Sequence, residues 1–162
     1  MTKASIFSSF IAMALLSACS DNAWFESYKE ISETGWSQDS VISFTIDITD
    51  TNAAYDARLL LRANADYPYS NLYIFREVES ERGKELRDTV QYVLADRFGK
   101  WLGEGVGDLK TYEWAYWPRS VQFKHAGTYK FTIQQAMRDH SLAGVTQVGL
   151  SLYKHKRNGR EQ

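Results

Sequence analysis

The chain has 162 residues, a formal net charge of −1 and a hydrophobic content of 44%, which is typical of one globular domain. The near-neutral charge argues against nucleic acid as a main partner, because phosphate binding requires a concentrated basic face. Aromatic residues make up 14% of the chain, and this favours strands over helices.

The N-terminus has the pattern of a bacterial lipoprotein signal. Lys3 precedes an apolar run from Ile6 to Leu16, which is shorter than the roughly 20 residues of a membrane span. The run ends in Leu-Ser-Ala-Cys at Cys19, which looks like a lipobox whose thiol receives a diacylglyceryl group. A plain signal followed by a buried free cysteine is the alternative, and it is less favoured because Cys19 is the only cysteine.

This pattern predicts a cleaved signal peptide over 1–18 and a lipidated tether over 19–23. Removing 18 of the 162 residues leaves a mature chain of 144 residues. With its single cysteine carrying lipid, that chain has no intrachain disulfide. The basic residues at the C-terminus predict a solvated, disordered tail over 156–162.

Between tether and tail, apolar and polar residues alternate with a period of two. The clearest case is 41–49, where Ile42, Phe44 and Ile46 are separated by polar residues. Segment 86–95 also fits a helix, but its β-branched residues and the hairpin tip before it favour a strand. The predicted strands are 24–31, 41–49, 55–62, 72–78, 86–95, 112–116, 121–123, 129–137 and 144–153.

About eight or nine strands without a convincing amphipathic helix predict an all-β domain over 24–155. We expect an antiparallel two-sheet β-sandwich, jelly-roll-like, and a closed barrel is the alternative. Gly99, Gly103, Gly105 and Gly107 predict one long loop around Trp101, because glycine permits tight turns.

No local pattern predicts catalysis, a metal or a cofactor. Glu104 and Asp108, with Asp96 before them, could form a glycosidase pair or hold Ca²⁺, but carboxylates near turns usually accept backbone hydrogen bonds. The three histidines lack the local spacing of a metal site, and the chain has neither a Gly-x-Ser-x-Gly elbow nor a complete phosphate loop. The histidines are His125, His140 and His155.

Two segments have distinctive sequences, LADRFGKWLGEGVGD over 94–108 and YPYSNL over 67–72. Both resemble the gliding-motility lipoprotein GldH family, as do the lipobox and short matches that extend over nearly all of the mature chain. The further matches are 61–62, 88–90, 127–129, 135–138 and 142–145.

The resemblance implies a lipoprotein that bacteria of the Bacteroidota type need for gliding over surfaces. It implies a lipid anchor at Cys19 that includes palmitate and is inserted in the outer membrane. It also implies partners among the other gliding-motility envelope proteins, which are linked to type IX secretion. The family has no known catalytic residues, so only the role of Cys19 is carried over.

We therefore expect a non-enzymatic accessory or assembly component, anchored in the bilayer, that works through its loops. The candidate partner contacts are Tyr67, Tyr69, Asn71, Trp101, Glu104 and Asp108. The alternative is a surface carbohydrate-binding β-sandwich lipoprotein with Trp101, Tyr67 or Trp117 as stacking platforms, although aromatic residues in a sandwich more often fill the core. A small hydrolase is the third and weakest hypothesis.

Overall fold

The computed structural model describes residues 23–155, and the predicted signal, Cys19 and the C-terminal tail lie outside the described residues. None of the described residues belongs to a helix that is long and apolar enough to cross a membrane. The strands are β1 (Phe25–Glu30), β2 (Trp36–Ser37), β3 (Ile42–Ile48), β4 (Ala54–Ala63), β5 (Asn71–Ser80), β6 (Gly83–Val93), β7 (Lys110–Ala115), β8 (Gly127–Gln135), β9 (Ser141–Leu142) and β10 (Val145–His155).

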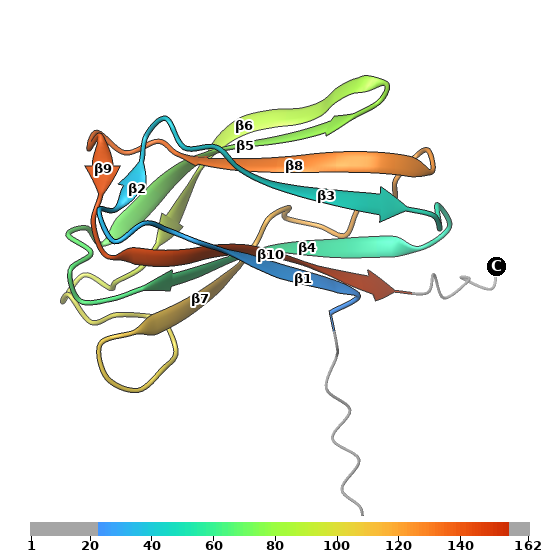
Figure 1. The fold of residues 1–162 in the computed structure, drawn as a ribbon. Coiled ribbons are helices and arrows are strands. Elements are labelled where there is room, and N and C mark those ends of the chain that lie inside the picture. Colours follow the sequence, from blue (N-terminus) through green and yellow to red (C-terminus); the bar gives the residue numbers. More distant parts are fainter. Residues whose placement is uncertain (1–22, 156–162) are drawn as a thin grey trace, which may run out of the picture.

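The eight longer strands of this described part form two antiparallel four-stranded sheets that face each other (Figure 1). Their orders are β1-β10-β4-β7 and β3-β8-β5-β6, while β2 and β9 pair separately. In chain order, the first long strand pairs with the eighth, the second with the seventh, the third with the sixth and the fourth with the fifth. This nested pairing is that of a jelly roll, so the predicted fold is confirmed and the barrel alternative is wrong.

The alternation in the sequence sets which side chains enter the core. In β3, Ile42, Phe44, Ile46 and Ile48 are buried and the residues between them are exposed. On β8, Tyr129, Phe131 and Ile133 are buried beside them. Burying a large apolar side chain contributes about 1.5–3 kcal/mol, so these rows hold the two sheets together.

The strand predictions for 86–95 and 121–123 had different outcomes. Segment 86–95 lies in β6 and is a strand, as favoured. The predicted strand over 121–123 is wrong, because the segment makes only one isolated bridge, between Tyr55 and Val121. Pro118 and the turn at Lys124 leave too little extended chain for a second pair.

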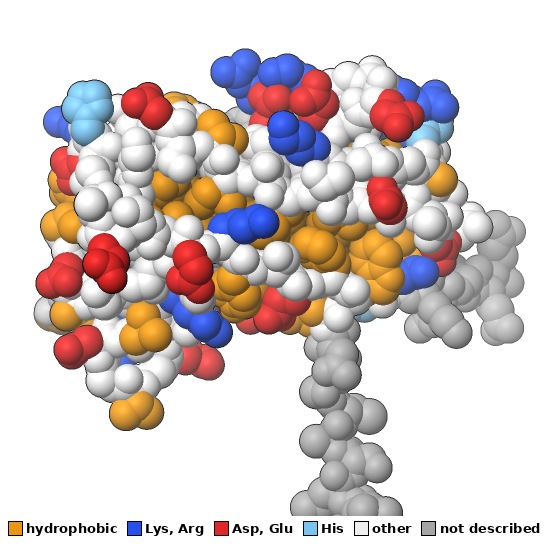
Figure 2. Space-filling view, viewed as in Figure 1, with side chains coloured by type: hydrophobic (Ala, Val, Ile, Leu, Met, Phe, Trp, Pro, Cys, Tyr) orange, Lys and Arg blue, Asp and Glu red, His pale blue; other side chains and the backbone are white. Residues whose placement is uncertain are grey.

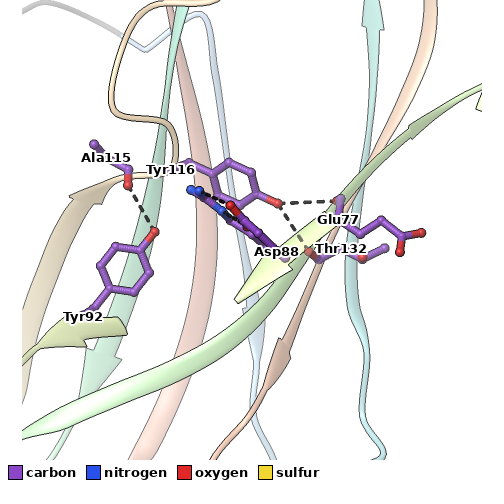
Figure 3. A network of polar contacts seen from close by, with 7 residues as sticks. Glu77, Asp88, Tyr92, Ala115, Tyr116 and Thr132 are labelled. Atoms are coloured by element: carbon purple, nitrogen blue, oxygen red, sulfur yellow. Dashed lines mark hydrogen bonds and ion pairs between the residues drawn. The ribbon is translucent and has the colours of Figure 1, made fainter. Parts of the chain in front are cut away.

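A polar network lies inside the sandwich at the side of β6 and β7 (Figure 3). The Arg76 guanidinium donates two hydrogen bonds to the Asp88 carboxylate, at 2.6 and 2.8 Å, and lies 5.2 Å from the Tyr116 ring centroid. The Tyr92 hydroxyl donates to the Ala115 carbonyl at 3.1 Å. The Arg76 hydrogen bond lowers the pKa of Asp88, and burial raises the pKa of Tyr116.

Candidate contact surface

The Tyr-Pro corner, residues 67–71, is built around a buried tyrosine. Tyr67 lies in the core, and its hydroxyl donates a 2.7 Å hydrogen bond to the Asn71 carbonyl. Burial raises the pKa of Tyr67. Gly144 lies so close that a Cβ there would be 2.1 Å from the Tyr67 nitrogen. Tyr67 therefore positions the corner and has no ring surface to offer a partner, contrary to its proposed role as a direct contact.

The glycine loop, residues 94–109 between β6 and β7, is joined to this corner. The backbone amides of Leu94 and Ala95 both donate to the Ser70 carbonyl, at 2.7 and 3.1 Å. The Trp101 ring is half-buried and meets the Tyr67 ring edge-on, with centroids 6.5 Å apart. The structure thus brings together the two segments that the sequence singled out, and we refer to them as the loop end.

Hydrogen bonds hold the glycine loop in one conformation. The Asp96 carboxylate accepts from the backbone amides of Phe98 and Lys100, at 2.8 and 3.0 Å. Glu104 and Thr111 exchange two backbone hydrogen bonds of 2.7 and 2.8 Å. Asp96 is therefore a turn acceptor, which is the interpretation that the sequence favoured over catalysis.

Large apolar side chains project from this loop into solvent. Val106 is 99% exposed and Phe98 is 78% exposed, followed by Leu102 at 55% and Leu109 at 44%. Hydrophobic side chains are visible at the lower left of Figure 2, where Figure 1 places this loop. Sequence reasoning missed all four of these residues as contact candidates. The available signal was their position among glycines, outside any strand alternation that would bury them.

The predicted polar members of the surface differ in their surroundings. Glu104 and Asp108 are exposed on the glycine loop. Tyr69 is half-buried, and its hydroxyl donates to the Asp139 carboxylate at 2.8 Å; this hydrogen bond raises the pKa of Tyr69. Tyr69 and Asn71 line a depression of about 330 Å³ with four further residues, Tyr73, Ala136, Met137 and Arg138.

The loop end lies at the opposite end of the sandwich from the start of β1, the strand that the predicted tether precedes. β1 begins at Phe25, which pairs with Leu152 of β10, whereas β7 begins beside Ala63, which pairs with Val145 of β10. Seven residues of strand separate these two levels, which corresponds to roughly 20 Å. The loop end is therefore presented away from the start of β1.

A separate cavity of about 570 Å³ lies beside β7. Trp114 and Trp117 form part of its wall, together with charged side chains that include Arg58, Glu113 and Arg119. Trp117 is half-buried and also packs against Phe123 and Phe131. The residues that the structure describes contain no group of three or more His, Cys, Asp or Glu arranged to hold a metal ion.

The fold and this surface together define a class: a jelly-roll domain that presents a preformed, partly apolar loop end. The GldH lipoprotein family model matches residues 23–152. A gliding motility lipoprotein GldH homolog of Christiangramia forsetii is 35% identical over 157 residues, covering 93% of this chain and 95% of that protein. Gliding motility lipoprotein GldH of Flavobacterium johnsoniae is 32% identical over 149 residues, covering 88% and 91%. The chain belongs to the GldH lipoprotein family, whose name implies a membrane-anchored place in the cell envelope.

Among solved structures, the chain is similar to the VP2 subviral particle of infectious bursal disease virus, with a TM-score of 0.35 and 11% identity. The match covers 85% of this chain but only 32% of the viral one, so the chain spans about a third of that protein. A likeness this low carries no argument about function.

Proposed function

We propose that this protein is a non-enzymatic outer-membrane lipoprotein that acts as an accessory or assembly component of the gliding-motility machinery linked to type IX secretion. Family membership supports the connection with gliding. The observation that carries the proposal is the loop end, where exposed apolar side chains stand on a hydrogen-bonded loop.

The loop end has the properties of a protein contact. Val106, which is 99% exposed, and Phe98, which is 78% exposed, lie on one loop with the exposed Leu102 and Leu109. Large exposed apolar surface marks interaction sites. The hydrogen bonds around Asp96 and Glu104 order the loop before binding, which lowers the entropy lost on association. Another envelope protein of the gliding machinery is the partner that we propose.

Cys19 supplies the anchor in this proposal. A single acyl chain gives only marginal membrane binding, whereas two or more hold a protein stably, at about 0.8 kcal/mol for each buried CH₂. A Cys19→Ala variant should lose palmitate incorporation and leave the membrane pellet. Unchanged membrane partitioning of this variant would contradict the anchor.

Surface spreading of a gliding host tests the function. Deletion of the gene should stop spreading, and the Phe98→Asp/Val106→Asp double variant should fail to restore it although it reaches normal abundance in membranes. Ala126→Asp, at an exposed apolar position in the turn before β8 at the tether end, is the control that should restore spreading. Normal spreading of the deletion strain would refute the function, and full rescue by the double variant would refute the loop end as the contact.

A second candidate function is carbohydrate binding at the cavity beside β7. Its support is the combination of Trp114, Trp117 and Arg119 around one opening, since aromatic faces and charged hydrogen-bonding groups suit sugars. The burial of Tyr67 counts against the platform expected from the sequence. A glycan array compares the native chain with Arg119→Ala; absence of binding by the native chain at high concentration would remove this candidate.

A further inference from the structure

The two sheets have four edge strands, and one of them differs from the others in charge. β1 carries Glu26, Lys29 and Glu30 within six residues, and β6 and β7 carry further Lys, Arg, Asp and Glu. β3 has seven residues, of which only Asp47 is charged. The segment from Val41 to Ile46 contains no charge, proline or glycine. Native proteins usually guard an exposed edge with charge, proline or a bulge, so β3, with Asp47 alone, is the least guarded of the four edges.

The free side of β3 has no partner in the described part of the chain. Its backbone pairs with β8 in an unbroken register from Ile42 to Ile48, and none of the backbone hydrogen bonds outside the strand pairs involves these residues. Figure 2 shows this side of the molecule, with hydrophobic side chains along the middle, a basic side chain among them, and other charged side chains above and below this row and at its ends. Val41 and Trp24 are among the exposed hydrophobic residues.

We propose that β3 pairs antiparallel with β3 of a second copy of this chain, which joins the two β3-β8-β5-β6 sheets into one. The register must place the buried faces of the two β3 strands on the same side of the joined sheet. A shift of one residue would turn the apolar row of one copy toward solvent. With that condition, the register centred on Thr45 is the one that pairs all seven residues of both strands. It places Thr45 opposite Thr45 of the second copy.

The side chains in this register are complementary. Ser43 lies opposite Asp47 of the second copy, so a hydroxyl donor meets a carboxylate, and the central threonines form a favourable cross-strand pair. Lys130, on the same face, is the partner of Thr45 on β8 and so lies one strand away from the new pairing. Pairing of β3 with a second copy's β1, β6 or β7 would instead meet the charges that guard those edges.

The symmetry of this pairing also suits a shared membrane. An antiparallel pair within one sheet has its two-fold axis perpendicular to that sheet, so both β1-β10-β4-β7 sheets lie in one layer. Each tether enters that layer through β1. The two anchors can therefore reach the same bilayer, which raises the effective concentration of the copies. This step alone rests on the proposed lipidation of Cys19.

Disulfide formation in membranes of cells that carry the full-length chain tests the pairing. Thr45→Cys should form a dimer on oxidation, because directly opposite strand residues lie within the Cα separation that a disulfide spans. Thr89→Cys is the matched control, since Thr89 is an exposed threonine on the other edge strand of the same sheet. We expect at least a tenfold excess of the Thr45→Cys dimer. Equal yields, or no Thr45→Cys dimer, would overturn the proposal.

Charge variants distinguish a second copy from a foreign strand. Two differently tagged copies that both carry Thr45→Lys should co-purify at least fivefold less than native copies, because like charges lie directly opposite, whereas Thr89→Lys should have no effect. Combining one Thr45→Lys copy with one Thr45→Glu copy should restore co-purification. Failure of this mixed pair would refute self-pairing. A dimer of the oxidised native chain would report a free Cys19 thiol and contradict the anchor, while the comparison of Thr45→Cys with Thr89→Cys would still decide the edge pairing.

Discussion

The partly buried ion pair between Arg76 and Asp88 provides a quantitative test of the fold. The Arg76 side chain is 8% exposed and that of Asp88 is 39% exposed. The two residues are direct partners across β5 and β6, on the face that points into the sandwich. Asp88→Ala would leave the guanidinium in the core, beside the Tyr116 ring, without its counter-ion.

The geometry sets the size of the effect. Removal of one partner of a fully buried pair costs about 3–5 kcal/mol. Water reaches Asp88, so we discount this to about 2–3 kcal/mol of unfolding free energy. The exposed pair of Arg58 and Glu113, with 41% exposure on each side, is the matched reference. Glu113→Ala should cost less than about 1 kcal/mol.

Urea denaturation followed by tryptophan fluorescence measures both values. A double-mutant cycle with Arg76→Met and Asp88→Leu isolates the pair: each single change should destabilise the protein, and the double variant should regain most of the loss because an apolar pair leaves no buried charge. Equal losses for Asp88→Ala and Glu113→Ala, or single variants whose effects simply add, would refute the reasoning.

Three further predictions concern pH and backbone geometry. The hydrogen bond from Arg76 lowers the pKa of Asp88. The stability that this hydrogen bond contributes is therefore present above about pH 3.9 and is lost as the pH falls through the folded-state pKa of Asp88. The urea midpoint of Asp88→Asn should change less below about pH 4 than the urea midpoint of the native chain. Burial raises the pKa of Tyr67. The stability contributed by the neutral Tyr67 side chain is therefore fully present below about pH 10 and is lost at higher pH. The urea midpoint of Tyr67→Phe should fall less at alkaline pH than the urea midpoint of the native chain. Gly144 and Gly99 both have positive φ, but only Gly144 faces backbone at its Cβ position; thermal unfolding should show Gly144→Ala to be at least about 2 kcal/mol less stable than Gly99→Ala.

The fold could be predicted because its strands have one face exposed to solvent and one face buried in the core. In β3 and β8 the alternation alone indicates which side chains are buried, and the structure follows it residue by residue. The same rule failed at 121–123, where two apolar residues in alternation suggested a strand. Extended backbone becomes a strand only when a neighbour offers several partners, and Val121 meets Tyr55 alone. That information lies 66 positions away in the sequence.

Arg76 shows a second limit of period-two reasoning. It occupies an inward position of β5, between Ile74 and Val78, where alternation requires an apolar residue. Its compensation, Asp88, belongs to the neighbouring strand. A single sequence shows the charge in the row, but only the register of β5 with β6 shows that the charge is neutralised.

The candidate surface was also predicted only in part. The two segments could be chosen from their composition, but exposure within them could not, because it depends on contacts between segments. Tyr67 is buried because the corner packs against Gly144. Trp101 is half-buried because the glycine loop packs against Tyr67. The rings that looked most suited to a partner therefore hold the loop end together. The positions left for contact are those that no neighbour covers, Phe98 and Val106 above all.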